Sequence, residues 1–381
     1  MARRRLPRIV WEYIERGAEE ETTLGLNRAA LRAIQFAPRA LVDVSRRSQE
    51  VTVLGIPFHS PFGIAPLSPL GLCRHDAEIA LARAAHAANV PFVLSSHADV
   101  SLERVTASAG AAPWLQVYPF ADRAKGEALL KRADRAGCQV LVLTADVPVR
   151  GNREYNERNG FAIPPKLSLS TLAEGVLHPG WVMNVYLRSL IGGYLRALLR
   201  KGREEMRVRR DLHDWRDVAW LRRGWPGKLV IKGILSAEDA RFAAEQGADA
   251  IVVSNHGGRQ LDSSPATIDV LPEIVAAAGD RLAVFIDGGF RRGADIAKAL
   301  ALGADMVFIG RSAVYGVAAG GEAGARRVLE ILRSEIDRVL ALLGCNAVTE
   351  LGPQHLRLPV AKAAHAPDAA GTQRRPRSVA A

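Results

Sequence analysis

The sequence has few cysteines, and their spacing is not typical of a metal site. Cys73, Cys138 and Cys345 are the three cysteines among 381 residues. They cannot all pair, so we expect neither a disulfide framework nor a zinc site, and a reducing compartment fits best. The N-terminus is basic but runs into Trp11 without an apolar segment. We therefore expect no signal peptide and no secretion.

Lysine is also scarce, since eight lysines stand against forty-three arginines. The formal net charge of +11 is compatible with attraction to nucleic acid or an anionic membrane, and equally with a general preference for arginine. No basic motif interleaved with aromatic residues is present, so we expect no nucleic-acid partner. With 48% apolar and 24% charged residues, the chain has ample material for a globular core.

Short apolar, β-branched runs recur along the chain, and alanine-rich helical patterns follow nearly all of them. The runs predict strands at Phe62–Leu67, Phe92–Ser96, Trp114–Tyr118, Val140–Asp146, Leu229–Ile234, Ala250–Asn255, Ala283–Gly289 and Met306–Arg311. Alternation of strand and helix implies parallel strands with helical crossovers. Eight such units predict an α/β fold of the TIM (β/α)₈ barrel type, because a doubly wound sheet usually has fewer strands and an early nucleotide fingerprint.

Three segments lie outside this repeat. Residues 1–60 predict an N-terminal helical cap followed by a hairpin around Val51–His59. Residues 147–228 predict a long insertion after strand four, at the end of the barrel where loops build active sites. We expect one domain over residues 1–360 and a disordered tail over residues 361–381, which is rich in Ala, Pro and Arg.

Polar side chains stand at the ends of most predicted strands, and in a barrel these ends meet at the catalytic rim. They are Ser95, Gln116, Tyr118, Thr144, Asp146, Lys232, Ser254 and Asn255, with His256 and Arg259 close behind. A single Ser, Thr or Gln at a strand end is more often a helix cap or a loop hydrogen bond. The recurrence of such residues on nearly every strand favours an active site.

The last two strands predict a phosphate site. Small residues and cations follow both strands, namely Asp287, Gly288, Gly289 and Arg291 after the seventh and Gly310 and Arg311 after the eighth. Backbone N–H groups can approach an anion there while the arginines neutralise its charge. The alternative is that the glycines only make tight turns. No Gly-x-Gly-x-x-Gly element follows a strand, so a Rossmann-type nicotinamide site has no support.

His256 is the candidate general base. An isolated histidine is usually structural, but this one is predicted on the rim, beside two glycines and three residues before Arg259. Asp146 on the same rim would stabilise the imidazolium. Arg259 and Arg153 would bind a substrate carboxylate through charge-assisted hydrogen bonds.

The run Ser254-Asn-His-Gly-Gly-Arg-Gln-Leu-Asp262, with Leu143-Thr-Ala-Asp146, Ile231-Lys-Gly233 and Asp287-Gly-Gly-Phe-Arg-Arg-Gly293, resembles the FMN-dependent 2-hydroxy-acid oxidoreductases. The resemblance implies oxidation of an L-2-hydroxy acid to the 2-oxo acid in a homo-oligomer, a tetramer in this family. It implies FMN held by Ala65, Pro66, Leu67, Ser95, Gln116, Thr144, Lys232, Ser254, Asp287, Gly288, Gly289, Arg291, Gly310 and Arg311. Substrate would contact Tyr13, Tyr118, Arg153, His256 and Arg259, with Asp146 as the partner of His256.

Two departures from the family pattern lie beside the implied pocket. Leu67-Ser68 stands where many members have Thr-Ala or Thr-Gly, and His97 stands where glycolate oxidases have tryptophan. These positions bear on substrate size and on reactivity toward oxygen, so the identity of the 2-hydroxy acid stays open.

The insertion bears on the electron acceptor. Residues 177–210 combine a helical apolar pattern with many arginines, which suits an amphipathic segment in a membrane interface. The alternative is a lid or an oligomer contact. A His-Pro-x-Trp element at 178–181 resembles the loop of membrane-associated lactate and mandelate dehydrogenases, so we expect a cytoplasmic enzyme, peripheral on the inner face of the membrane, that reduces a quinone.

Two other enzyme functions compete with this one. The first is an oxidase of the same family that passes its electrons to oxygen. The second is another phosphate-binding barrel enzyme, which lacks a candidate nucleophile because none of the three cysteines lies at a predicted catalytic strand end.

Overall fold

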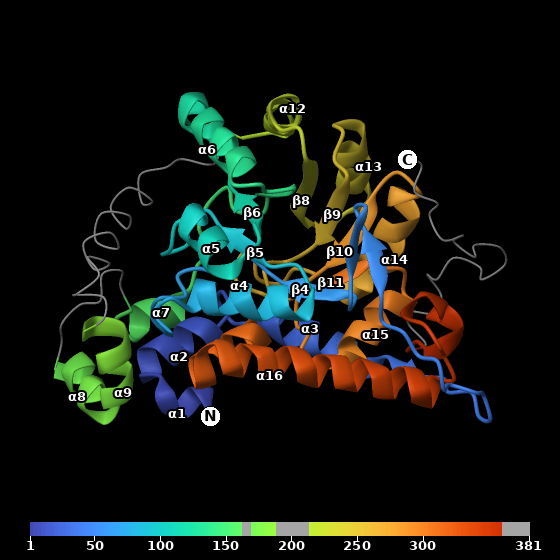
Figure 1. Cartoon of the computed structure of the whole chain (residues 1–381), viewed down its shortest axis with the longest axis horizontal. Coiled ribbons are helices and arrows are strands. Elements are labelled where there is room, and N and C mark those ends of the chain that lie inside the picture. The colour runs from blue at the N-terminus through green and yellow to red at the C-terminus, as the bar shows by residue number, and fades with distance from the viewer. Residues whose placement is uncertain (162–168, 188–212, 360–381) are drawn as a thin grey trace.

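A computed structural model of the chain describes residues 1–161, 169–187 and 213–359 (Figure 1). The predicted tail at 361–381 and the greater part of the apolar and basic segment at 177–210 lie outside these ranges. No cysteine in the described ranges is disulfide-bonded, and all three are buried.

Within the described ranges, eight parallel strands form one sheet with the order β4-β11-β10-β9-β8-β7-β6-β5. A parallel bridge between Ile64 and Phe92 joins its two outer strands, so the sheet closes into a barrel. The TIM-barrel prediction is confirmed, although every strand except β8 ends earlier than predicted. They are β4 (Phe62–Ile64), β5 (Val93–Ser95), β6 (Trp114–Val117), β7 (Val140–Thr144), β8 (Lys228–Ile234), β9 (Ala250–Val253), β10 (Ala283–Ile286) and β11 (Met306–Ile309).

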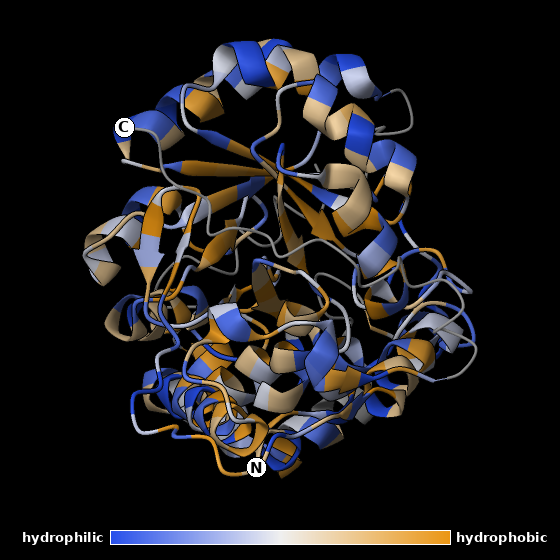
Figure 2. Cartoon of the chain, turned by 90° about the vertical axis from the view of Figure 1, so that its right-hand side faces the viewer, coloured by the Kyte–Doolittle hydropathy of each residue, from blue (hydrophilic) through white to orange (hydrophobic). Residues whose placement is uncertain are grey.

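The core has two layers because nearly every strand residue is buried and side chains alternate between the two faces of the sheet. One layer fills the barrel, where Trp114 packs against Phe285 and Phe308 with ring centroids 6.1 and 5.7 Å away. The other layer lies between the strands and the surrounding helices. Figure 2 shows hydrophobic strands at the centre and helices of mixed character around them.

Helices follow the strands as predicted, and polar side chains cap the first turns of some of them, such as α6 and α13. The Asp122 carboxylate accepts the N–H groups of Ala124 and Lys125, and Ser236 accepts that of Asp239. The helices are α4 (Ala77–Ala88), α5 (Leu102–Ala109), α6 (Arg123–Arg135), α13 (Ala237–Glu245), α14 (Thr267–Ala278), α15 (Gly293–Ala301) and α16 (Arg311–Leu343).

The N-terminal region forms the expected helical cap and hairpin. Its elements are α1 (Ala2–Arg5), α2 (Arg8–Glu15), α3 (Thr22–Ala33), β1 (Gln35–Phe36), β2 (Val51–Val53) and β3 (Ile56–Phe58). The hairpin of β2 and β3 places Val53 and Phe58 in the barrel interior cluster, so it closes one end of the barrel. Strand β1 pairs with β12 (Leu356–Arg357) and ties the cap to the last described residues.

The insertion separates β7 from β8, as predicted. Its described elements are α7 (Glu154–Arg158), α8 (Leu169–Leu177), α9 (Pro179–Val182), a π-helical turn (Met183–Leu187) and α12 (Trp215–Gly224). The Trp181 indole donates to the Leu72 carbonyl at 2.7 Å, and the His75 N–H donates to Asn184 Oδ1 at 3.0 Å. These bonds attach α9 and the π-helical turn to the loop after β4. None of the described helices is long and apolar enough to span a membrane.

Candidate active site

The carboxyl ends of β5, β6 and β7 carry a continuous chain of buried polar side chains. Ser95 Oγ lies 3.0 Å from Gln116 Oε1, and Gln116 Nε2 donates to Thr144 Oγ1 at 2.9 Å. All three residues are at most 5% exposed. Buried polar groups are retained where they have partners or bind a ligand, and this chain forms one side of the predicted flavin site.

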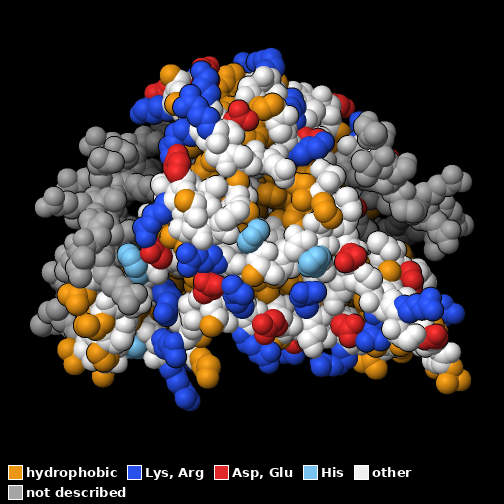
Figure 3. All heavy atoms as spheres, in the orientation of Figure 1, with side chains coloured by type: hydrophobic (Ala, Val, Ile, Leu, Met, Phe, Trp, Pro, Cys, Tyr) orange, Lys and Arg blue, Asp and Glu red, His pale blue; other side chains and the backbone are white. Residues whose placement is uncertain are grey.

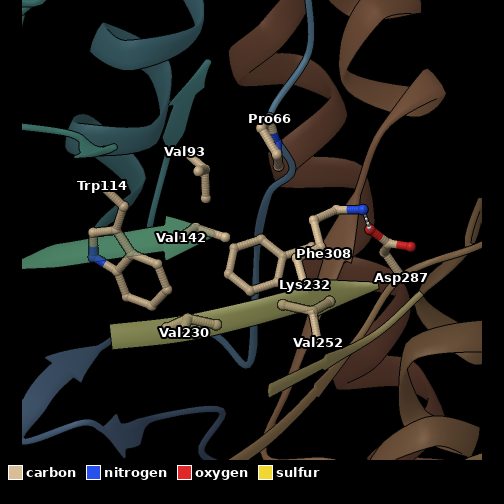
Figure 4. A pocket seen from close by; sticks show the side chains of 9 residues that line it. All are labelled: Pro66, Val93, Trp114, Val142, Val230, Lys232, Val252, Asp287 and Phe308. Carbon is tan, nitrogen blue, oxygen red and sulfur yellow. Dashed lines mark ion pairs between the residues drawn. The ribbon is translucent and has the colours of Figure 1, made fainter. Parts of the chain in front are cut away.

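A second buried cluster lies across the rim at the ends of β8, β9 and β10. The Lys232 ammonium donates to Ser254 Oγ at 2.7 Å and pairs with Asp287 at 3.1 Å. Burial opposes the charge, but Asp287 and Asp146 outweigh it and raise the pKa of Lys232, so the cation persists. Figure 4 shows this ion pair at the edge of a small cavity of about 10 Å³ in the barrel interior, next to Phe308.

His256 and Asp146 meet at the same rim, as predicted. The His256 Nδ1 atom lies 3.1 and 3.2 Å from the two Asp146 carboxylate oxygens, so Nδ1 carries the shared proton and Nε2 is the basic nitrogen. Burial lowers the pKa of His256, and Lys232 and Arg153 lower it further against the opposing effect of Asp146. Burial would raise the pKa of Asp146, but the neighbouring His256 and Lys232 bring it below its ordinary value. The pair therefore rests as neutral imidazole and carboxylate.

This pair predicts a specific pH response. A general base must be neutral to accept a proton, so with His256 in that predicted role kcat/KM should fall as the pH drops through the His256 pKa, below the ordinary value of 6.5. Because Asp146 raises that pKa, Asp146→Asn should move the acidic limb to still lower pH and also slow the reaction. The check is the pH profile of kcat/KM for both proteins. An acidic limb that moves to higher pH in the variant would contradict the assigned pairing.

Arg153 and Arg259 lie together beside the N-terminal cap. Arg153 Nε donates to the Arg259 carbonyl at 3.3 Å, while Arg259 Nη1 donates to the carbonyls of Tyr13 and Arg16 at 2.6 and 3.0 Å. The Arg259 guanidinium also lies 4.8 Å from the centre of the Tyr13 ring. Each guanidinium keeps further N–H donors for a ligand. Sequence reasoning placed these three residues in one site, and the structure brings them together.

The two departures from the family pattern also meet at this rim. The His97 ring stacks on Tyr118 with centroids 4.7 Å apart, and Ser68 Oγ donates to the His97 carbonyl at 2.5 Å. The Tyr13 hydroxyl donates to the Ser68 carbonyl at 3.0 Å, and the Tyr13 ring stacks on Phe161 at 4.4 Å. An aromatic wall with polar groups at its edge therefore borders the site.

The segments after β10 and β11 have the features of a phosphate site. Gly288 and Gly289 have φ of 99° and 84°, and a Cβ atom at Gly289 would lie 2.9 Å from that of Asn27, so both positions require glycine. Among the described residues, the N–H groups of both glycines have no acceptor. Helix α16, which is kinked by non-helical backbone at Gly321, begins directly after Gly310. Together with buried Lys232 and the polar chain of Ser95, these donors fit FMN and its phosphate.

The two arginines of this region are held by protein groups. Arg311 donates to the carbonyls of Ile14, Arg16 and Gly257 at 2.9, 3.3 and 2.9 Å, and burial with the nearby Arg291 lowers its pKa to about 10. Arg291 donates to the Tyr315 hydroxyl, which in turn donates to Glu15. The guanidinium groups thus join the N-terminal cap to the predicted phosphate site, and any phosphate contact would use their remaining donors.

Sequence reasoning placed Asn255 at the rim and Asp262 in the family motif but assigned neither a role, and it missed Asn27. Asn27 and Asn255 exchange two amide hydrogen bonds of 2.9 Å, and Asp262 accepts the first N–H groups of α3 from Thr22 and Thr23. His256 itself adopts φ of 55°, a left-handed conformation that needs such support in a residue other than glycine. The position of Asn255 next to His256 was the one available signal, and nothing in the sequence marks Asn27.

The comparisons with known proteins agree with this geometry. The chain matches the family model described as FMN-dependent dehydrogenase over residues 2–358. It is 43% identical to glycolate oxidase 5 of Oryza sativa, covering 93% of each chain. It is 40% identical to (S)-mandelate dehydrogenase of Pseudomonas putida, covering 94% of this chain and 92% of that protein. The solved structure of the monotopic membrane protein (S)-mandelate dehydrogenase superposes with a TM-score of 0.87 at 40% identity, covering 94% of this chain and 97% of that one. The chain therefore belongs to the FMN-dependent dehydrogenase family, and it is an FMN-dependent enzyme that oxidises 2-hydroxy acids.

Proposed function

We propose that this enzyme oxidises an L-2-hydroxy acid to the 2-oxo acid, with His256 as the general base. The observation that carries the proposal is the contact of His256 Nδ1 with Asp146 at 3.1 Å, because it leaves Nε2 free to accept a proton next to two arginines that suit a carboxylate. The relative named for (S)-mandelate supports the L configuration. The test is the stoichiometry of the reaction. For each molecule of 2-oxo acid formed, one molecule of a two-electron acceptor should be reduced.

The chain's own residues account for the other parts of the reaction. Arg153 and Arg259 would hold the substrate carboxylate and so fix the α-carbon near His256. Asp146 would stabilise the imidazolium once His256 has accepted a proton, which comes from either the α-carbon or the hydroxyl group. FMN, when bound, would supply the acceptor for the two electrons that the substrate loses when its α-C–H bond breaks. The Lys232 cation would stabilise negative charge that develops beside it.

We infer that the backbone around Gly288, Gly289 and Gly310 binds the FMN phosphate and that Arg291 and Arg311 add charge there. Replacing both arginines by alanine should weaken cofactor retention by roughly 1.5–3 kcal/mol for each charge-assisted bond lost. The measurement is the flavin absorbance per chain after dialysis. Full flavin loading of the double variant after dialysis would place the phosphate elsewhere.

We also propose that the enzyme contacts a membrane through α8, α9 and the π-helical turn and passes its electrons to a quinone. Four apolar side chains of this region, those of Val176, Leu177, Met183 and Leu187, are between 46% and 80% exposed. Figure 3 shows hydrophobic side chains gathered over α8 and α9. Clustered exposed apolar residues favour a binding surface, and the similar (S)-mandelate dehydrogenase structure is described as monotopic. The tetramer implied by the family resemblance stays a prediction.

Changing these four apolar residues to serine should release the enzyme from vesicles that contain anionic lipid. Burial of a large apolar side chain contributes about 1.5–3 kcal/mol, so the loss should exceed tenfold in partitioning. A matched control is Leu342→Ser on α16. The Leu342 side chain is 67% exposed but lies far along the chain from α8, so this change should not affect vesicle binding. Flavin content should stay unchanged in both. The proposal fails if the native protein ignores such vesicles and makes hydrogen peroxide as fast as it reduces a quinone analogue.

A further inference from the structure

Arg150 is a cation near the substrate site that the proposed mechanism does not use. It lies in the loop that leads from Asp146 to Arg153, and its side chain is exposed. Within the described part of the chain, its guanidinium forms no hydrogen bond and no ion pair. An exposed arginine is usually only a solvated surface residue, so the case for a function depends on where the backbone holds it.

The backbone on both sides of Arg150 is fixed by one side chain. Gln260 Nε2 donates to the Val149 carbonyl at 3.0 Å, and Gln260 Oε1 accepts the Gly151 N–H at 3.2 Å. A Cβ atom at Gly151 would lie 2.5 Å from the Arg259 carbonyl oxygen. The backbone of the loop therefore packs directly against the segment that carries Arg259. Arg150 is therefore anchored at the rim rather than carried by a free loop.

Arg150 adds to a concentration of positive charge. Burial, the nearby Arg259 and then Arg150 lower the pKa of Arg153 to about 10. Burial is also the largest cause that lowers the pKa of Arg259, and Arg311 and Arg150 add to it. Arg150 thus stands within electrostatic reach of both arginines assigned to the substrate carboxylate. Like charges within electrostatic reach of one another repel, and an anion bound among them would relieve that repulsion.

Three of the acidic residues near this site already have partners, and the exposed Glu19, whose N–H donates to the Asn152 carbonyl at 2.9 Å, forms no ion pair with Arg150 within the described residues. Asp146 pairs with His256 and Asp287 pairs with Lys232. Glu154, which follows Arg153, accepts from Arg158 at 2.6 Å. One substrate carboxylate would satisfy Arg153 and Arg259 as a pair. The charge of Arg150 is left without a counterpart.

We propose that Arg150 binds a second carboxylate, carried on the side chain of the substrate, so that the preferred substrates are 2-hydroxy dicarboxylic acids. This inference rests on the proposed function, because it takes Arg153 and Arg259 as the ligands of the first carboxylate. An exposed position at the rim suits the distal end of a substrate whose reacting carbon lies beside His256. The aromatic wall of Tyr118 and His97 would border the same side chain.

The test is anaerobic reduction of the bound flavin by L-malate and by L-2-hydroxybutyrate, which share a four-carbon chain and differ in the distal carboxylate. Because no acceptor and no membrane is present, discrimination can come only from the substrate site. The native enzyme should bind malate about 10- to 100-fold more tightly, the usual effect of a hydrogen bond to a charged group. Arg150→Leu should abolish that preference, and Arg150→Lys should keep part of it.

Arg158→Leu is the matched control, since Arg158 lies in the same insertion but is paired with Glu154. It should leave the discrimination unchanged. Equal affinities of the native enzyme for the two acids, or an equal loss for both in Arg150→Leu, would overturn the proposal. So would an effect of Arg150→Leu confined to vesicle binding or quinone reduction, which would assign Arg150 to the membrane or the acceptor. Failure of both acids, and of lactate and mandelate, to reduce the flavin would instead overturn the proposed function.

Discussion

Replacing His256 by glutamine should leave FMN bound and the fold intact while flavin reduction by substrate slows by about 10²–10⁴-fold or more. The reason is that Nε2 of His256 is the one nitrogen positioned as base, since Nδ1 is shared with Asp146. Glutamine keeps a polar side chain of similar reach but cannot accept a proton at neutral pH. The measurement is the anaerobic rate of flavin bleaching at saturating substrate.

A structural role for His256 would give a different result. Its left-handed backbone and its N–H bond to Ser254 at 3.1 Å help to shape the loop, so a loss of structure would also lower flavin content and thermal stability. The visible spectrum and the melting temperature of the variant control for this. Flavin reduction at near the native rate would remove His256 from the role of base.

Replacing Arg259 by methionine should chiefly weaken substrate capture, raising the substrate concentration for half-maximal flavin reduction by about 10- to 100-fold. Arg259→Lys should also be impaired, because an ammonium lacks the planar fork that binds a carboxylate through two bonds. The structure adds a second consequence. Arg259 also donates to the carbonyls of Tyr13 and Arg16, so the methionine variant should loosen the N-terminal cap.

The two effects at Arg259 can be separated by their readouts. Loss of substrate capture appears in the concentration dependence of flavin reduction, whereas loosening of the cap appears in proteolysis near Arg16 without substrate. An unchanged concentration dependence in the methionine variant would show that the carboxylate binds elsewhere.

The barrel and its rim could be predicted from sequence because both follow from local patterns. A run such as 140–143 is apolar at each position, as a strand buried on both faces must be. Residues after such runs fall at one rim by the geometry of parallel strands, which is why Asp146 and His256 meet although 110 residues separate them.

Contacts between distant segments could not be predicted in the same way. The pair of Asn27 and Asn255 joins residues 228 positions apart, and no periodicity encodes a single pair. The contact of the Arg291 side chain with Tyr315 could not be predicted either, because the sequence places a cation near the predicted phosphate site without showing which neighbour holds it. Arg150 was overlooked since its importance comes from the fixed backbone beside Gln260 and not from its residue type.

The most direct test of the account is anaerobic mixing of the purified yellow protein with the two enantiomers of a 2-hydroxy acid. The flavin absorbance should bleach with the L enantiomer, one equivalent of 2-oxo acid should form for each flavin reduced, and the D enantiomer should have little effect. The same experiment with Asp146→Asn should show slower bleaching at neutral pH. A flavin that stays oxidised with each L-2-hydroxy acid tested, mono- or dicarboxylic, would contradict the account.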